Sequence, residues 1–552
     1  MEFSKSSRLK SIEESKIKCY DLIIVGGGIT GAGIALDASS RGLSVLLIEK
    51  DDFGEGTSSR STKLVHGGLR YLKNLEFGLV RDSGRERSVL YQNAPHIVYP
   101  QKMMLPLYKG FGYGKWISSM GLWFYDYLAG VEPVYKKQTL NKEKTLSKNP
   151  ILKQEGLKGA IQYYEYRTND ARLVIENLKK AYEFGAKSIN YCEAHKIKRS
   201  EQEVRLSVKD KLTDKEIQFK SKMLINATGI WSDGFLEKQE LSDEPAVLAS
   251  KGTHLVVSKE KMPCQTALYF ELEDKRMIFA IPKDDKVYIG TTEEAYHEDL
   301  DEVFPIKYEI EYLLNAINNF LNISIKPRDV EVAWSGLRSL VLNGSNDLNK
   351  VSRKEKIIEH YPNLISILGG KLTAYRLMAE QIVDRIVKQF PDTNLKVCNT
   401  RKIPLAGAEF EFGIIEPNKI VTFAEQKFYE SYQLSLTTDQ VYRLFYTYGK
   451  NVDSIINKAY ELYNQVEEKS LAILEAEIWY CTEYEMCIKL SDFMMRRTER
   501  FLFAHKASQK QLEEISNLLA KYLQWTDEEK DLELLNYRQI CTKSHSYLKV
   551  YR

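Results

Sequence analysis

A glycine-rich turn between an apolar strand and a helix constrains this chain more than any other feature. Tyr20–Val25 forms a short apolar run that leads directly into Gly26-Gly27-Gly28-Ile29-Thr30-Gly31, and a helical pattern follows to about Arg41. A second apolar strand spans Ser44–Glu49. This order of strand, turn, helix and strand predicts a parallel sheet with helices on its faces.

The turn matches G-x-G-x-x-G, and each glycine has a separate physical role. Gly26 permits the tight turn, Gly28 lets a pyrophosphate approach the backbone, and Gly31 lets the helix pack on the strand. The first N–H groups of the helix bind phosphate, and Glu49 accepts from ribose hydroxyls. The motif predicts a dinucleotide site; a turn without a ligand is the minor alternative.

The number of such turns bears on which dinucleotide binds. We find no second fingerprint for a nicotinamide cofactor, and Asn226-Ala227-Thr228-Gly229 ends a strand that can return to the first cofactor. A single site favours tightly held FAD that is reduced directly by a substrate. NAD as a dissociable hydride acceptor stays open.

Composition excludes several classes of protein. The 552 residues are too many for one compact core, and 79 basic against 76 acidic side chains argue against nucleic acid as the main partner. With 43% hydrophobic and 28% charged residues, the chain is neither largely disordered nor a polytopic membrane protein. Seven scattered cysteines without a Cys-x-x-Cys pair predict no disulfide framework and no metal site, as in a reducing cytoplasm.

Periodicity changes along the chain. Residues 187–226 alternate as strands in an antiparallel excursion, residues 250–291 are strand-rich, and Leu372–Phe390 has one apolar helical face. Proline and glycine residues in Lys402–Pro417 indicate a domain boundary, and the rest reads as helical, including one long run from about 469 to 502. Thr526 and Glu529 form a predicted capping box.

Seven motifs, in order, resemble one family: the FAD-dependent glycerol-3-phosphate dehydrogenases and the related α-glycerophosphate oxidases. They are YDLIIVGGGITGAGIALDASSRGLSVLLIEK at 20–50, GTSSRSTKLVHGGLRYL at 56–72, NATGIW at 226–231, SKGTHLVV at 250–257, SGLRSL at 335–340, GGKLTAYR at 369–376 and YCTEYEMCIKLSDFMMRRTERFLF at 480–503.

The resemblance implies an α/β fold: a Rossmann-type FAD-binding domain with a mixed/antiparallel substrate-binding sheet, plus an all-α C-terminal domain. We expect a polar leader at 1–19, an oxidoreductase region at 20–400 and a helical domain at 401–552. Within the oxidoreductase region, the expected FAD-binding parts are about 20–90, 165–235 and 340–390, and the substrate-binding parts are about 91–164 and 236–339.

The implied reaction is oxidation of sn-glycerol 3-phosphate to dihydroxyacetone phosphate, with hydride transfer to the flavin and electrons passed to a membrane quinone. An oxidase that makes hydrogen peroxide is the first alternative, although we see no extra insertion typical of the oxidases. A non-catalytic FAD-binding sensor or scaffold is the alternative of another class, and an amino-acid oxidase on the same fold is a further one.

Residues for substrate and catalysis come from the family match. Arg70, Arg338 and Lys371 match cations near the substrate phosphate, and arginine suits phosphate because its planar fork donates two parallel hydrogen bonds. His254 matches a histidine at the substrate site and is our first candidate for the base, with Arg338 beside it in catalysis. His66 is the second candidate, and Tyr71 is expected to orient the substrate. Without the motifs, each cation would read as a surface residue.

A larger set is expected to bind the cofactor. Gly370 precedes a helix whose N–H groups and dipole, with the charge of Lys371, would face the anionic edge of reduced flavin. The full set is Gly26, Gly28, Ile29, Thr30, Gly31, Glu49, Lys50, Thr57, Ser58, Ser59, His66, Gly67, Ala227, Gly229, Gly370, Lys371, Leu372 and Thr373.

The segment 99–137 combines aromatic residues, among them Trp116 and Trp123, with flanking lysines. Such a composition suits a bilayer interface, and a helix buried in the substrate domain is an equal alternative. Lacking a signal peptide or a spanning run, the protein is expected in the cytoplasm, peripheral on the inner face of the cytoplasmic membrane. A homodimer is left open.

Overall fold

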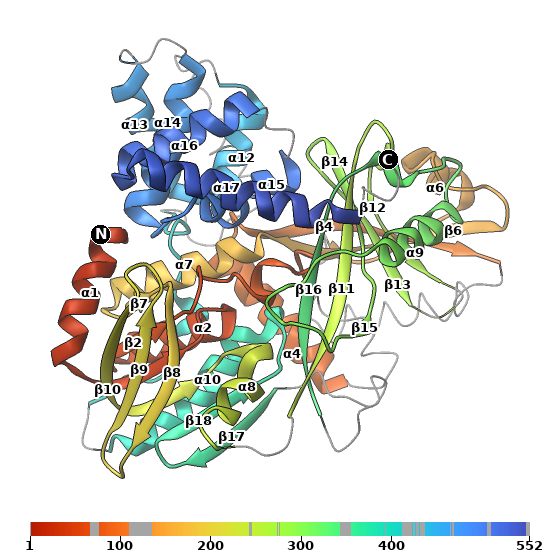
Figure 1. The fold of residues 1–552 in the computed structure, drawn as a ribbon. Coiled ribbons are helices and arrows are strands. Elements are labelled where there is room, and N and C mark those ends of the chain that lie inside the picture. Colours follow the sequence, from red (N-terminus) through yellow and green to blue (C-terminus); the bar gives the residue numbers. More distant parts are fainter. Residues whose placement is uncertain are drawn as a thin grey trace.

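The computed structural model describes residues 2–66, 77–109, 135–241, 246–272, 274, 276–342, 355–391, 394–410, 422, 426, 430, 436–463, 465, 469–504 and 509–547. These residues form two sheets and a group of C-terminal helices, which lie on one side of both sheets in Figure 1. The fold class expected from the sequence, α/β with an all-α C-terminal part, is confirmed.

The first sheet has the order β17-β18-β10-β1-β2-β7, and β8 and β9 extend it from β10. Its strands are β1 (Cys19–Val25), β2 (Val45–Ile48), β7 (Lys187–Ile189), β8 (Cys192–Arg199), β9 (Val204–Asp210), β10 (Lys215–Asn226), β17 (Lys356–Tyr361) and β18 (Leu364–Leu368). β1 is parallel to both β2 and β10, while β8, β9 and β10 are antiparallel. The antiparallel segment predicted at residues 187–226 therefore returns to the main sheet through β10, which pairs with β1. Open α/β sheets bind ligands at the carboxyl ends of such parallel strands.

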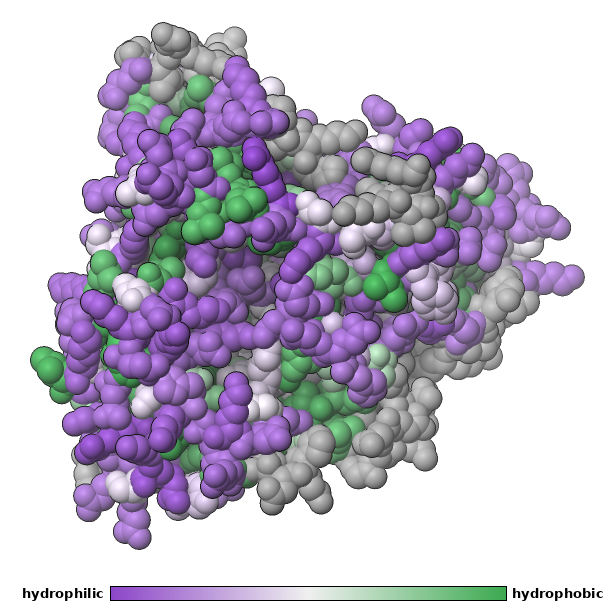
Figure 2. Space-filling model, in the orientation of Figure 1, coloured by the Kyte–Doolittle hydropathy of each residue, from purple (hydrophilic) through white to green (hydrophobic). Residues whose placement is uncertain are grey.

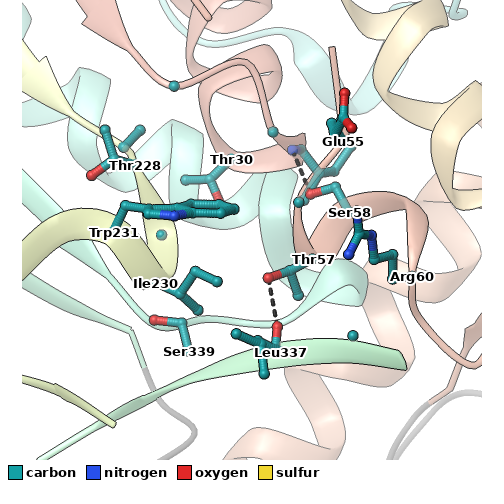
Figure 3. A pocket seen from close by; sticks show the side chains of 18 of the residues that line it. Thr30, Glu55, Thr57, Ser58, Arg60, Thr228, Ile230, Trp231, Leu337 and Ser339 are labelled. Atoms are coloured by element: carbon teal, nitrogen blue, oxygen red, sulfur yellow. Dashed lines mark hydrogen bonds between the residues drawn. The ribbon is translucent and has the colours of Figure 1, made fainter. Parts of the chain in front are cut away.

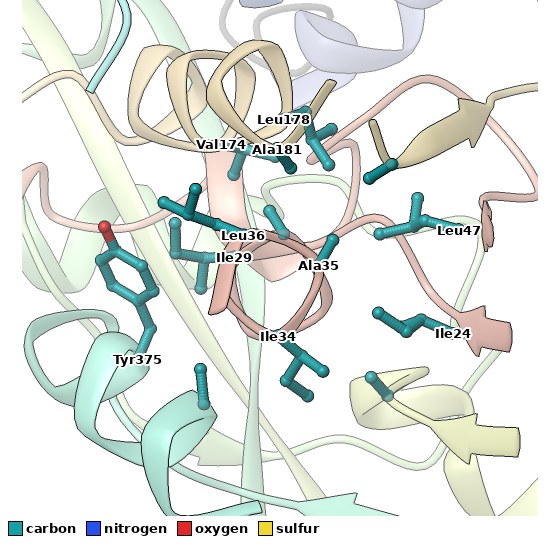
Figure 4. Packing of buried hydrophobic residues seen from close by; sticks show 14 of the residues in the cluster. Ile24, Ile29, Ile34, Ala35, Leu36, Leu47, Val174, Leu178, Ala181 and Tyr375 are labelled. Atoms are coloured by element: carbon teal, nitrogen blue, oxygen red, sulfur yellow. The ribbon is translucent and has the colours of Figure 1, made fainter. Parts of the chain in front are cut away.

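Three helices cover one face of this sheet. They are α2 (Ile29–Arg41), α7 (Asp170–Glu183) and α10 (Tyr375–Ile386), and Figure 4 shows their apolar side chains meeting around α2. Small residues on α2 bring the helices close: a Cβ at Gly33 would lie 2.7 Å from the ring of Tyr375. This packing fixes the N-terminus of α2, and with it the glycine turn.

The second sheet has the order β15-β11-β14-β13-β12-β4-β6-β3, with β16 paired to β11 and β5 to β6. Its strands are β3 (Leu64–Val65), β4 (Val98–Tyr108), β5 (Gln138–Leu140), β6 (Leu157–Thr168), β11 (Val247–Ser258), β12 (Ala267–Glu271), β13 (Met277–Lys283), β14 (Lys286–Gly290), β15 (Glu294–Ala295) and β16 (Val330–Val341). The pairing of β12 with β4 is parallel and the other pairs are antiparallel. Helix α9 (Lys307–Asn318) packs against this sheet.

The C-terminal helices correct one expectation. The helices are α12 (Thr438–Tyr448), α13 (Val452–Tyr463), α14 (Lys469–Tyr484), α15 (Arg500–Phe503), α16 (Gln509–Leu523) and α17 (Asp527–Ser544). The capping box of Thr526 with Glu529 is present. The single helical run expected at 469–502 is wrong, because α14 ends at Tyr484 and a π-helical turn at Asp492–Arg497 precedes α15. Arg496 and Arg497 in that turn form ion pairs with Asp52, in the loop after β2, so tertiary contacts override the local helical pattern.

The N-terminal segment, to which periodicity assigns no element, forms α1 (Lys5–Ile17). Its buried face carries Arg8, whose guanidinium lies 2.6 Å from the Asp210 carboxylate. A polar residue buried by pairing leaves no apolar stripe, which explains why the pattern did not predict the helix. The other α-helices among the described residues are α4 (Phe77–Asn93), α6 (Lys142–Lys148) and α8 (Ser232–Glu237).

The face of the molecule in Figure 2 is mostly hydrophilic, with hydrophobic residues in small groups. Among the described residues, no helix combines the length and the apolar character needed to cross a bilayer. Most of the aromatic segment expected at a membrane interface, residues 110–134, lies outside the described residues.

Candidate functional site

A cavity of about 780 Å³ is lined by both sheets, within the size range of small-molecule and cofactor sites. At one end, which we call the nucleotide end, it is lined by the glycine turn and the end of β2. At the other, the sheet end, it is lined by β11, β16 and residues 369–373. Figure 3 shows part of the lining, with residues 55–60 between the two ends.

At the nucleotide end, the glycines have no room for side chains. A Cβ at Gly26 would lie 2.4 Å from the Ala227 carbonyl oxygen, and a Cβ at Gly31 would lie 1.9 Å from the Gly26 carbonyl oxygen. Gly26 also has a φ of 112°, which favours glycine. Ser58 completes the turn, because its hydroxyl accepts from the Ile29 N–H at 3.0 Å and so caps α2.

Glu49 lies beside this turn. Its carboxylate accepts hydrogen bonds from the Gly27 N–H at 2.6 Å and the Asp51 N–H at 3.0 Å. Burial raises the pKa of Glu49 to about 7, although these two backbone donors act in the opposite direction. The Lys50 ammonium lies 4.2 Å from the centre of the Trp231 ring, and both side chains donate to Asp301.

At the sheet end, β11 and β16 run antiparallel in a register that puts three pairs on one face. The pairs are His254 with Trp334, Gly252 with Gly336, and Ser250 with Arg338. A Cβ at Gly252 would lie 2.4 Å from a terminal nitrogen of Arg338, so the guanidinium folds back over the glycine pair toward His254. Since Gly252 and His254 are two residues apart, the cation lies roughly 7 Å along the strand from the histidine.

His254 is buried and held on several sides. Its ring stacks on Trp334 at 4.6 Å, and its Nε2 lies 2.9 Å from the Thr62 hydroxyl. Burial, followed by the charges of Arg338 and Lys63, lowers the pKa of His254 well below its usual value near 6.5. The imidazole is therefore neutral at physiological pH, which is the form that can accept a proton.

The turn before α10 closes the sheet end. Gly369 and Gly370 have φ values of 69° and 95°, and a Cβ at Gly370 would lie 2.2 Å from the methyl carbon of Met378. The Thr373 hydroxyl donates to the His66 carbonyl at 3.2 Å, which joins this turn to the loop after β3. The regular helix begins at Tyr375, after a 3₁₀ turn at Leu372–Ala374, three residues later than the sequence pattern predicts.

The C-terminal helices are tied to both ends of the cavity. Asp52, near the nucleotide end, pairs with Arg496 at 2.5 Å and Arg497 at 2.6 Å. Glu499 pairs with Lys283 and, at 2.8 Å, with Lys63, which directly follows the Thr62 that contacts the catalytic candidate. Lys63 also pairs with Asp170 at 2.6 Å.

Most of the expected site residues line this one cavity. Gly31 and Ser59 do not, although Gly31 shapes the turn as described, and Gly67, Arg70 and Tyr71 lie outside the described residues. The residues that line the cavity are Gly26, Gly28, Ile29, Thr30, Glu49, Lys50, Thr57, Ser58, His66, Ala227, Gly229, His254, Arg338, Gly370, Lys371, Leu372 and Thr373.

Sequence reasoning missed Arg60, Thr62 and Trp231, which also line the cavity. All three lie inside motifs that were recognised, GTSSRSTKLVHGG and NATGIW. Membership of these motifs could therefore have identified them as candidate site residues. Glu499 lies in a recognised motif as well, but nothing in its sequence context points to Lys63.

The residues fit a dinucleotide cofactor. A glycine cradle that a Cβ would fill, a capped helix N-terminus and a carboxylate at the end of β2 are the parts that such a cofactor needs. Together with a second sheet that brings a neutral histidine to the same cavity, they define a dinucleotide-dependent oxidoreductase.

Comparison with known proteins gives the same class. Residues 21–385 match the family described as FAD dependent oxidoreductase, and residues 398–530 match the C-terminal domain of alpha-glycerophosphate oxidase. The chain is 40% identical to an aerobic glycerol-3-phosphate dehydrogenase of Staphylococcus haemolyticus over 93% of its length and 92% of that protein, and 37% identical to one of Bacillus subtilis over 98% of both.

Among solved structures, the chain resembles the glycerol-3-phosphate dehydrogenase of Bacillus halodurans complexed with FAD, with a TM-score of 0.83, 35% identity and 99% of both chains covered. The chain belongs to the family of aerobic glycerol-3-phosphate dehydrogenases, and its cofactor is FAD. An L-alpha-glycerophosphate oxidase of Mycoplasma pneumoniae, at 16% identity and a TM-score of 0.55, shares the fold over 69% of this chain and 97% of its own.

Proposed function

We propose that this protein oxidises sn-glycerol 3-phosphate to dihydroxyacetone phosphate and passes the electrons to a quinone. The proposal rests on the row of paired residues on β11 and β16. There the neutral His254 and Arg338 line the same cavity, with the glycine pair Gly252 and Gly336 between them. A substrate that carries a phosphate a few bonds from a secondary alcohol matches that row. The names of the relatives, aerobic glycerol-3-phosphate dehydrogenases, support the same substrate.

In this proposal, Arg338 and Lys371 hold the phosphate dianion together with Arg70, and Tyr71 orients the substrate; Arg70 and Tyr71 lie outside the described residues. His254 takes the hydroxyl proton as the C2 hydrogen leaves with its electron pair, and Thr62 keeps the ring in place. Bound FAD supplies the acceptor for that hydride. Burial and the charges of Arg338 and Lys63 keep His254 neutral, which is the form that can accept the proton.

An anaerobic titration of the full-length holoprotein with glycerol 3-phosphate tests the substrate. We expect the oxidised flavin absorption to bleach with one equivalent of substrate, whereas glycerol, which lacks the phosphate, should leave it unchanged at the same concentration. A flavin band that persists at saturating glycerol 3-phosphate would refute the substrate and favour the sensor or scaffold alternative.

The electron acceptor needs a separate experiment. After anaerobic reduction, we expect a short-chain ubiquinone or menaquinone analogue to reoxidise the flavin much faster than air-saturated buffer does. Hydrogen peroxide formed at the full turnover rate without quinone would instead identify an oxidase.

Contact with the membrane follows from the proposed acceptor, since quinones dissolve in the bilayer. We propose that the protein is peripheral on the inner face of the cytoplasmic membrane, supported by the aromatic residues and lysines of segment 99–137. Flotation with vesicles containing anionic lipid tests this, and protein that stays at the bottom of the gradient contradicts it.

A further inference from the structure

Arg60, which follows the 3₁₀ turn at Thr57–Ser59, lines the cavity, and the described residues offer its guanidinium neither a hydrogen bond nor an ion pair. Its backbone is fixed: its N–H donates to the Thr57 carbonyl at 3.2 Å, and a Cβ at Gly336 would lie 2.6 Å from the Arg60 carbonyl oxygen. Arg60 therefore has a fixed backbone at the wall of the cavity.

Arginines that are more deeply buried than the half-buried Arg60 have carboxylate partners in the described part of the chain. Arg376 pairs with Glu86 at 2.6 Å, and Arg496 and Arg497 pair with Asp52. Glu55, whose charge acts on Arg60, lies 3.4 Å from Arg496 and forms no ion pair with Arg60. A half-buried guanidinium stays protonated, and its desolvation is costly unless an anion meets it. An anion bound in the cavity could therefore pair with Arg60 without displacing a described partner.

The location of Arg60 identifies the anion. Two residues before it, Ser58 caps the N-terminus of α2, and Figure 3 shows the Arg60 side chain beside that of Ser58. The N–H groups and the dipole at this terminus favour phosphate groups. The anion of the bound cofactor that reaches this helix is the diphosphate that joins its two halves.

We propose that Arg60 binds the diphosphate of FAD and neutralises part of its charge, an interaction that supplements the backbone N–H groups of the glycine turn. The same diphosphate occurs in ADP, whereas adenosine has the nucleoside alone. Arg60 is hence a determinant of affinity for diphosphate-containing ligands and contributes nothing to recognition of the nucleoside. This inference concerns the cofactor only and is independent of the proposed substrate.

The test compares the wild-type full-length protein with Arg60→Met. In the holoprotein, we expect FAD to dissociate on dilution at a roughly ten- to hundredfold higher protein concentration in the variant, as for loss of a charge-assisted hydrogen bond. After reversible removal of the flavin, calorimetry should show ADP binding weakened by a similar factor and adenosine binding unchanged. Arg60→Lys keeps the positive charge but not the planar guanidinium, and its affinity for ADP should lie between those of the wild type and Arg60→Met.

Lys198→Met is the control for loss of a positive charge, because Lys198 is exposed and is not among the residues that line the cavity, and it should bind all three ligands as the wild type does. Equal weakening of ADP and adenosine in Arg60→Met would assign Arg60 a purely structural role and overturn the proposal. Unchanged ADP and FAD binding would also overturn it, since the guanidinium would then meet some other anion. If Arg60→Met does not fold, Arg60→Gln replaces it, and the changes in ADP affinity and in adenosine affinity relative to the wild type decide in the same way.

Discussion

The two ends of the cavity recognise their ligands by different means. The nucleotide end consists mainly of backbone. Its glycines have no room for a Cβ, a helix terminus is capped there, and Glu49 accepts hydrogen bonds from two N–H groups. The sheet end consists of side chains, with His254, Trp334 and Arg338 projecting from two paired strands. Backbone recognition serves a cofactor that stays bound, and side chains supply the charge and the proton acceptor that a reaction needs.

Burial acts on one titratable group at each end, and in opposite directions. It raises the pKa of Glu49 and lowers the pKa of His254, because burial disfavours the charged form of either group. At the nucleotide end, the backbone donors of Gly27 and Asp51 lower the pKa of Glu49 and so partly offset the effect of burial. At the sheet end, Arg338 and Lys63 reinforce burial, so the imidazole is neutral. The difference predicts that the two ends can be disabled separately.

The largest effect is expected at His254. His254→Gln should slow flavin reduction by glycerol 3-phosphate by roughly 10²- to 10⁴-fold, the range for loss of a general base, without weakening FAD binding. Anaerobic stopped-flow spectroscopy measures the rate. His66→Gln is the matched control, and a larger loss in that variant would make His66 the base. Because the pKa of His254 is well below 6.5, lowering the pH from 8 to 6.5 should not reduce the rate through this residue.

The second-largest effects are expected when the ion pairs that join the C-terminal helices to each end of the cavity are broken. Burial would raise the pKa of Asp52 and of Glu499, but Arg497 and Arg496 in one case, and Lys283 and Lys63 in the other, lower each to about 2. Asp52→Asn and Glu499→Gln should each reduce the free energy of unfolding by about 3–5 kcal/mol, as for a broken buried pair. Since both pKa values are lowered, this stabilisation is present above pH 4–5 and disappears as the pH falls toward 2.

Function distinguishes these two variants. Asp52→Asn should release FAD more readily, while Glu499→Gln should slow flavin reduction, because Lys63 directly follows the Thr62 that contacts His254. Flavin fluorescence after dilution and the anaerobic reduction rate measure the two properties. If both variants lost both properties equally, the ends of the cavity would be one cooperative unit and the comparison would fail.

Arg338→Met should weaken the apparent affinity for glycerol 3-phosphate by about 10- to 100-fold through loss of a charge-assisted hydrogen bond. FAD affinity should not change, because the guanidinium lies over Gly252 at the sheet end. The concentration dependence of flavin reduction gives the affinity, with Arg338→Lys as the variant that keeps the charge. A loss of FAD without a change in substrate affinity would contradict the assignment.

The sequence predicted the nucleotide end almost completely, because its parts are contiguous: Gly26 to Gly31 and Glu49 belong to one strand-turn-helix-strand unit, whose geometry follows from local rules. The sheet end needed the family resemblance, since nothing local places Arg338 within reach of His254. The glycine pair between them, Gly252 with Gly336, depends on a register that only the folded sheets define.

The contribution of the C-terminal helices was outside the reach of pattern analysis altogether. Helical periodicity at 469–502 predicted one continuous helix, yet the chain turns at Asp492–Arg497 so that Arg496 and Arg497 reach Asp52. Charged residues that pair over such sequence distances look like solvated surface residues in a helical pattern. Their burial is a property of the assembled fold, as it is for Arg8 in α1.

The smallest effect is expected at Glu49, and it concerns pH. With a pKa of about 7, Glu49 is largely protonated at pH 6, whereas accepting from ribose hydroxyls favours the carboxylate. FAD binding should therefore release a proton, so affinity should rise with pH up to about 7 and level off above it. Since charge-assisted hydrogen bonds exceed neutral ones by about 1 kcal/mol, the rise should be roughly fivefold. Titrations of FAD into apoprotein from pH 5.5 to 8.5 measure this, and Glu49→Gln should bind weakly with no slope. An equally steep slope in Glu49→Gln would assign the proton to another group and leave the nucleotide end without a titrating residue.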